Sequence, residues 1–84
     1  MDSRVIKAIE KVFDPKRFYL VRAFDAGDKF LLQMNRIDHR GKKIMLDPWY
    51  TINKKSLEVE FFNPAGKSKF FENAFQNPVE IGGD

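Results

Sequence analysis

The chain has 84 residues, of which 43% are hydrophobic and 14% aromatic, so we expect a single domain, residues 1–84, with one hydrophobic core. It contains no cysteine, which excludes disulfides and thiolate metal sites, and no stretch approaches the roughly 20 apolar residues of a membrane-spanning helix. The net charge of +3 is mildly basic, and many proteins without a nucleic-acid partner share it.

The first residues show no signal-peptide pattern, because Met1-Asp2-Ser3-Arg4 leads directly into an amphipathic segment. The absence of cysteine suits a reducing compartment. We therefore expect a cytoplasmic protein that does not bind membranes.

The first element is an N-terminal amphipathic helix. Its apolar residues recur at the spacing that lines one helical face. They are Val5, Ile6, Ala8, Ile9, Val12 and Phe13. Asp2 or Ser3 can cap the start, and Asp14-Pro15 ends the helix because Pro15 disfavours helical geometry at the preceding residue.

From residue 17 to residue 62 the hydrophobic period changes to two, which predicts strands at residues 17–25, 29–37, 43–52 and 57–62. Asp47-Pro48 is either an edge bulge or a turn that splits the third strand. Turn chemistry predicts the register of three pairs of neighbouring strands. Val21 pairs with Leu32 in the first and Met34 with Leu46 in the second. In the third, Ile52 pairs with Leu57 and Tyr50 with Val59.

These pairings separate the strand residues into an apolar face and a more polar one. The apolar face collects Tyr19, Val21, Ala23, Phe30, Leu32, Met34, Ile44, Leu46, Tyr50, Ile52, Leu57, Val59 and Phe61. The other face collects Gln33, Asn35, Thr51, Glu58 and Glu60, which we expect to be exposed. A slip of one residue would mix the two sets, so their separation supports the register.

Residues 67–75 predict a short second helix, with Phe70, Phe71, Ala74 and Phe75 on one side and Asn77-Pro78 as its stop. The fold class is therefore α+β: an N-terminal helix, an antiparallel meander of three to four strands and a short C-terminal helix. Both helices are expected on one sheet face, the apolar one.

No catalytic constellation is present, so we expect a non-enzymatic protein with no cofactor. The only histidine, His39, sits in a predicted turn without a nearby nucleophile and is expected to be solvated. Asp25 and Asp28 flank a tight turn but fall short of the oxygen ligands that calcium requires. Gly66-Lys67-Ser68 matches only the end of a phosphate-binding loop, since Phe61 stands where that motif needs a glycine.

The predicted register turns a second set of apolar side chains outward, on the face opposite the core. An exposed apolar patch usually marks an interaction site. The candidate protein-binding residues are Phe18, Leu20, Phe24, Leu31 and Trp49, with Ile37 and Phe62 beside them. The alternatives are that residues 79–81 cover part of this patch or that the first strand has another register.

Basic residues gather at one end of the predicted sheet, where the first and third strands begin and the second and fourth end. Such a cluster suits phosphate groups, although it is more commonly a solvated set of loop side chains. The candidate anion-binding or nucleic-acid-binding residues are Lys16, Arg17, Arg36, Arg40, Lys42, Lys43, Lys67 and Lys69.

The order of elements resembles a double-stranded RNA-binding domain, and Gly66-Lys67-Ser68-Lys69, followed by Ala74, resembles the start of that domain's second helix. The resemblance covers about a dozen residues and implies phosphate contacts from Lys67 and Lys69. The chain departs from the pattern at Phe70 and Phe71, has a fourth strand and lacks the loop motif that reads the minor groove.

Two classes of function follow from these patterns. The first is a small binding module that contacts a protein partner, or a second copy of itself, through the outer sheet face. The alternative is nucleic-acid binding, with double-stranded RNA among the candidates, through the basic end of the sheet. Glu58 and Glu60 beside Trp49 weigh against stacking of bases on the outer face.

Overall fold

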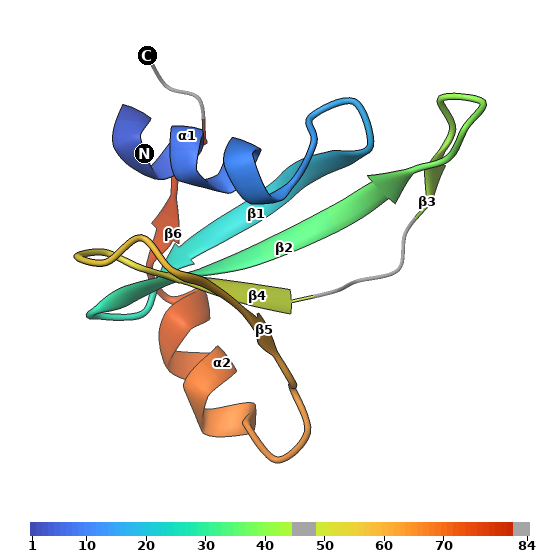
Figure 1. The fold of residues 1–84 in the computed structure, drawn as a ribbon. Coiled ribbons are helices and arrows are strands. Elements are labelled where there is room, and N and C mark those ends of the chain that lie inside the picture. Colours follow the sequence, from blue (N-terminus) through green and yellow to red (C-terminus); the bar gives the residue numbers. More distant parts are fainter. Residues whose placement is uncertain (45–48, 82–84) are drawn as a thin grey trace.

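The structure is a computed structural model that describes residues 1–44 and 49–81, apart from the side chains of residues 43 and 44. It confirms the α+β fold class, with one helix at the N-terminus and one near the C-terminus of the described chain (Figure 1). The elements are α1 (Ser3–Val12), β1 (Phe18–Asp25), β2 (Lys29–Ile37), β3 (Lys43–Ile44), β4 (Trp49–Asn53), β5 (Val59–Phe62), α2 (Ser68–Phe75) and β6 (Pro78–Val79). The antiparallel sheet has the order β5-β4-β2-β1-β6, and β3 pairs with the end of β2.

Helix α1 begins and ends where the sequence predicts. The carboxylate of Asp2 accepts a hydrogen bond of 2.9 Å from the backbone N–H of Arg4 and so caps the helix. Val5, Ile9 and Phe13 are buried against the sheet, where they join the apolar residues of the core. That core comprises Ala23, Leu32, Met34 and Ile52 from the strands.

Helix α2 covers the opposite face of the sheet, so the expectation that both helices share one face is wrong for α2 (Figure 1). Its ring contacts identify the face: Phe71 lies 5.0 Å from Trp49, and Phe75 lies 4.7 Å from Phe24, between ring centroids. The physical reason is that both faces of the sheet carry large apolar side chains. Each face needs a helix to remove that surface from water.

A β-bulge at Val21 corrects the predicted pairing of β1 with β2. Leu20 pairs with Met34 and Ala23 pairs with Leu32, so β1 has one more residue than β2 between these pairs. The extra residue reverses the alternation of side chains. Leu20 therefore packs on the α1 face, although the predicted register turned it toward the opposite face.

The pairing of β4 with β5 differs from the prediction by two residues: Ile52 pairs with Val59 and Tyr50 pairs with Phe61. A shift of two leaves every side chain on its predicted face, because the strand period is two. The connecting turn is longer than expected, and Leu57 within it has a φ of 62°. The predicted pairing of Met34 with Leu46 and the interpretation of Asp47-Pro48 lie outside the described residues.

Three of the five polar side chains expected to be exposed are buried instead, whereas Glu58 and Glu60 are exposed as predicted. Gln33, Asn35 and Thr51 are all less than a tenth exposed, because their side of the sheet is not left open to solvent. Gln33 accepts a hydrogen bond of 2.8 Å from Arg22 Nε, and Asn35 donates one of 3.2 Å to the hydroxyl of Tyr19. These partners offset part of the cost of removing amide groups from water.

The C-terminal segment closes the far edge of the sheet. Val79 pairs with Ala23 and Pro78 pairs with Phe24, so β6 lies beside β1 and does not cover the α2 face. The N-terminal amino group donates a hydrogen bond of 2.9 Å to the carbonyl oxygen of Glu80. Across the described residues, no helix is long and apolar enough to cross a membrane.

Asp25 and Lys54 tie the β1–β2 turn to the end of β4, and their contact predicts a pH dependence of stability. A 2.9 Å hydrogen bond from Lys54 Nζ, helped by one from the backbone N–H of Gly27, holds the pKa of Asp25 below its ordinary value. A carboxyl whose pKa is lower in the folded state stabilises the protein above its unfolded pKa, near 3.9, and loses this contribution as the pH falls through the folded pKa. Asp25→Ala should therefore lower the urea midpoint at pH 7 but leave it close to wild type at pH 2.

The matched control for this prediction is Asp28→Ala, which removes a carboxylate from the same turn with no ion pair among the described residues. Asp28→Ala should move the midpoint less than Asp25→Ala at pH 7. Equal effects of the two changes at both pH values would contradict the assigned role of the Asp25–Lys54 contact.

Candidate functional site

A cleft lies between the segment that joins α1 to β1 and the β2–β3 hairpin. Its volume is about 690 Å³. Its lining consists of Asp14, Lys16, Arg17, Arg36, Ile37, Asp38, His39 and Gly41. In each wall a single aspartate accepts hydrogen bonds from the backbone N–H groups of the turn.

Asp14 organises the first wall. Its carbonyl oxygen accepts hydrogen bonds from the backbone N–H groups of Arg17 (2.8 Å) and Phe18 (2.9 Å), and its carboxylate accepts one of 2.9 Å from the N–H of Lys16. Pro15 inside this turn excludes a further helical turn. The chain therefore reverses sharply after α1 and presents Lys16 and Arg17 to solvent.

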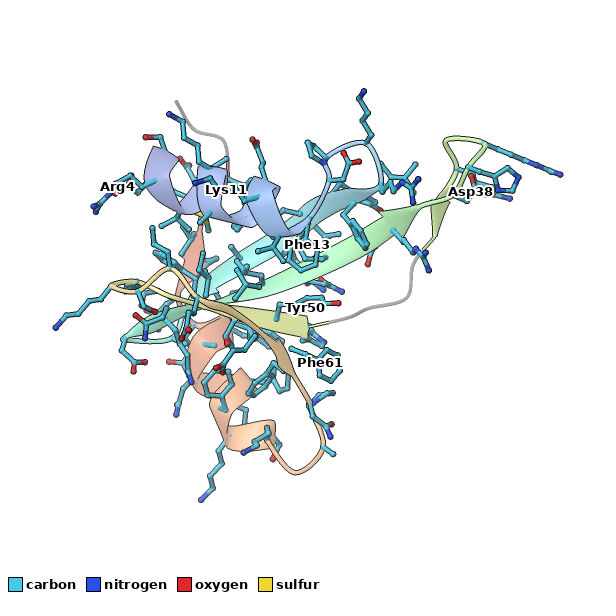
Figure 2. All side chains as sticks on the ribbon, viewed as in Figure 1. Arg4, Lys11, Phe13, Asp38, Tyr50 and Phe61 are labelled. Carbon is cyan, nitrogen blue, oxygen red and sulfur yellow. The ribbon has the colours of Figure 1, made fainter. Side chains whose placement is uncertain are left out.

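Asp38 organises the second wall, the hairpin that extends beyond the rest of the sheet (Figures 1 and 2). Its carboxylate accepts hydrogen bonds from the backbone N–H groups of Arg40 (2.9 Å) and Lys42 (2.8 Å). Gly41 occupies the left-handed region with a φ of 80°, as the predicted three-residue loop requires. The side chains of Arg40 and Lys42 are exposed in this loop.

The sheet holds the two walls together. The N–H of Ile37 donates a hydrogen bond of 2.6 Å to the carbonyl oxygen of Arg17, and Phe18 pairs with Arg36. Arg17, directly before β1, and Arg36, near the end of β2, are thus brought to the same cleft from distant parts of the sequence. Both residues line the cleft.

The described cations of this region have no carboxylate partner among the described residues. Within residues 1–44 and 49–81, none of Lys16, Arg17, Arg36, Arg40 and Lys42 forms an ion pair. The two nearby carboxylates, Asp14 and Asp38, accept from backbone N–H groups. Across the described residues of this region, with Lys43 counted from the position of its backbone, there are six cations against two carboxylates, a net +4 on a chain whose total charge is +3. We call these six cations the basic pole.

The structure brings together six of the eight predicted basic residues, and Lys67 and Lys69 are not among them. The backbone of Lys43 pairs with Ile37 in the hairpin, and its side chain is not described. The start of α2 lies elsewhere, because the ring of Phe70 contacts Lys29, with Nζ 5.9 Å from the ring centroid. Lys29 is at the opposite end of β2 from Arg36, about 23 Å away for seven residues of strand. The predicted contribution of α2 to the pole is therefore wrong.

The candidate protein-binding patch is not an exposed surface. Phe24 is 7% exposed and Leu31 is fully buried, both beneath α2, and Trp49 packs on Phe71. Phe18 and Leu20 are half-buried on the opposite face, against α1. The expectation of an outward patch of these five residues is wrong, because α2 occupies the face and the bulge at Val21 turns Leu20 away from it.

Sequence reasoning missed Phe61, which it assigned to the buried face. Phe61 does lie on the predicted face, the one that α1 covers. It is nevertheless 68% exposed, because β5 is the edge strand and α1 does not extend over it. His39 lines the basic cleft as an exposed turn residue. In the part of the chain that the structure describes, no three His, Asp or Glu side chains gather in a metal-binding group.

Comparison with known proteins adds no assignment, because no family model, no curated protein and no solved structure matches the chain.

Proposed function

We propose that this protein is a non-enzymatic, cytoplasmic binding module that recognises the phosphate backbone of a nucleic acid with its basic pole. The observation that supports this proposal most is the set of cations without ion pairs around the cleft between the α1–β1 turn and the β2–β3 hairpin. Lysine or arginine side chains that are paired with carboxylates would have to break those ion pairs before they bind phosphate. The described cations of the pole carry no such cost.

Arginine supplies the geometry for this recognition. A guanidinium group donates two parallel hydrogen bonds to the oxygens of one phosphate, and it remains charged at any physiological pH. Arg17, in the turn before β1, and Arg36, on β2, line the cleft, and Arg40 and Lys42 extend the positive surface along the hairpin. A series of cations on neighbouring turns suits the repeated charges of a backbone better than a single small anion.

The carboxylate of Glu60 does not oppose phosphate binding at Arg36. Glu60 pairs with Thr51, whose neighbour on β2 is Leu31, so all three lie on the α2 face. Arg36 follows Leu32 and Met34 on the α1 face. The carboxylate of Glu60 is thus separated by the sheet from the surface on which Arg36 lies.

Protein binding through the outer sheet face is the less supported class. Its candidate residues form the contact with α2, so a partner would have to displace that helix to reach them. The basic pole requires no rearrangement.

Salt dependence tests the proposal. Each phosphate neutralised by a cation releases counterions, so log affinity falls with log salt by about 0.9 per contact for duplex and 0.7 for single strands. The double change R17A and R36A should reduce this slope by about 1.4 to 1.8. Fluorescence anisotropy on labelled duplex RNA, duplex DNA and single strands, measured over a salt series, supplies the slopes.

The matched control is the double change K67A and K69A, which also removes two positive charges but far from the pole. Its slope should stay near that of wild type, and all four residues are exposed, so each substitution should alter stability by no more than about 0.5 kcal/mol. Equal loss of slope in both double variants would mean that only net charge matters. Failure of every strand to bind below about 100 μM at low salt would refute the proposal.

A further inference from the structure

A row of aromatic rings crosses the α1 face of the sheet and ends at the exposed edge strand β5. The centroid of Phe18 lies 5.3 Å from that of Phe13, Phe13 lies 4.7 Å from Tyr50, and Tyr50 lies 5.7 Å from Phe61. Phe13, Tyr50 and Phe61 appear in this order from the end of α1 to β5 in Figure 2. Phe13 is buried, Tyr50 is half-buried and Phe61 is 68% exposed, so the row passes from the core to solvent.

The exposed end of this row is held rigidly. Phe61 meets Tyr50 at an interplanar angle of 80°, and Tyr50 meets Phe13 at 70°, so each ring supports the next edge to face. The strand pairing of Phe61 with Tyr50 fixes the backbone beneath both rings. A flat apolar ring that is largely exposed and yet held in place provides a surface for stacking.

Arg36, the strand residue of the basic pole, lies at one side of these rings on the same sheet face. Tyr50 pairs with Leu32, and Arg36 is four residues further along β2, about 13 Å away. Phe18, at the other end of the row, pairs directly with Arg36. The distance from Arg36 to Phe61 is thus one that a few linked nucleotides span.

A second basic group lies on the other side. A groove of about 430 Å³ between α1 and the β4–β5 turn is lined by Arg4, Lys7, Ala8, Lys11, Val12 and Leu57. Lys7 and Lys11 form no ion pair within the described residues, and Leu57 is four residues from Phe61 along the chain. The exposed ring therefore lies between two separate groups of cations.

We infer that the nucleic acid is single-stranded, with its phosphates on the two basic groups and one base stacked on Phe61 beside Tyr50. This inference rests on the proposed function. A duplex keeps its bases paired and stacked inside, so only an unpaired strand offers a base face to an exposed ring while its backbone follows the cations. The arrangement of cations around a rigid aromatic side chain matches the way in which proteins hold single strands without sequence preference.

The test compares a labelled ten-nucleotide single strand, an abasic strand of equal length and phosphate number, and a duplex of equal length. F61A should weaken binding of the base-containing strand about 5- to 150-fold, the range for loss of one stacked base. It should leave the abasic strand within about twofold of wild type, since the phosphate contacts are unchanged. F61Y, which keeps an aromatic face, should retain most of the affinity, whereas F61L should not.

I81A provides the matched control, because Ile81 is another exposed apolar side chain and follows β6 at the opposite edge of the sheet. It should bind all three probes like wild type. If F61A binds the base-containing strand as tightly as wild type while R17A with R36A binds it more weakly, the stacking inference fails and the proposed function stands. If no probe binds, both fail. Loss of a dimer in F61A, measured by light scattering without nucleic acid, would instead assign Phe61 to contact between copies of this chain and overturn the inference.

Discussion

Leu31→Ala and Leu32→Ala are expected to lower the free energy of unfolding by similar amounts, about 2–5 kcal/mol each. The two residues are neighbours on β2 and point to opposite faces, Leu32 toward α1 and Leu31 toward α2, and both are fully buried. Each truncation removes several methyl and methylene groups from a packed core and leaves a cavity. Urea unfolding monitored by the fluorescence of Trp49 measures both effects.

This pair of variants tests whether both faces of the sheet are covered. In a fold with both helices on one face, one member of the pair would be exposed and its truncation would cost about 0.5 kcal/mol or less. F61A is the control for a large apolar side chain that is mostly exposed, and we expect it to cost much less than either leucine. A small effect at Leu31 with a large one at Leu32 would show that α2 does not pack where the structure places it.

Phe24→Ala should cost about 3–5 kcal/mol, because the Phe24 ring lies under α2 against Phe75 (4.7 Å) and near Trp49 (6.5 Å). Trp49→Ser should have a similar cost, since the indole packs on Phe71 and Phe75 as well. The expected phenotype is a protein that unfolds at lower urea concentration, with near-native secondary structure by circular dichroism before the transition.

The same two variants decide between a core and an interface at this face. If Phe24 and Trp49 served a partner, their substitution would abolish binding and leave stability nearly unchanged. Phe75→Ala is an informative control from the helix side, because Phe75 contacts both rings but is itself 45% exposed. It should destabilise less than Phe24→Ala. Stability equal to wild type in Phe24→Ala would restore the interface hypothesis.

The proposed function changes how the charge pattern is interpreted. Composition alone describes a mildly basic chain, and most such chains do not bind nucleic acids. The fold concentrates more than the whole net charge around one cleft and leaves the described cations there without carboxylate partners. Local concentration of unpaired charge is what attracts a polyanion, since charges farther apart than a Debye length of about 8 Å are screened from one another.

Local chemistry in the sequence determined several elements. The spacing of Val5, Ile9 and Phe13, with Asp2 before them and Pro15 after them, predicts α1 to within a residue or two, because capping, periodicity and a helix stop are all local. The Asp38 turn with Gly41 predicts the β2–β3 hairpin for the same reason. The hairpin and the α1–β1 turn together account for five of the six residues of the basic pole, and Arg36 at the end of β2 is the sixth.

Tertiary structure alone decided the face on which α2 packs, the bulge at Val21 and the exposure of Phe61. Phe24, Leu31, Trp49 and Phe62 look like an exposed patch in sequence, because alternation shows which side chains share a face but not what covers that face. The bulge inserts one residue, which places Phe18 and Leu20 before it on the face opposite to the predicted one, and no residue type at Val21 signals it. Phe61 is exposed because β5 is the edge strand, and strand order depends on packing between segments distant in sequence.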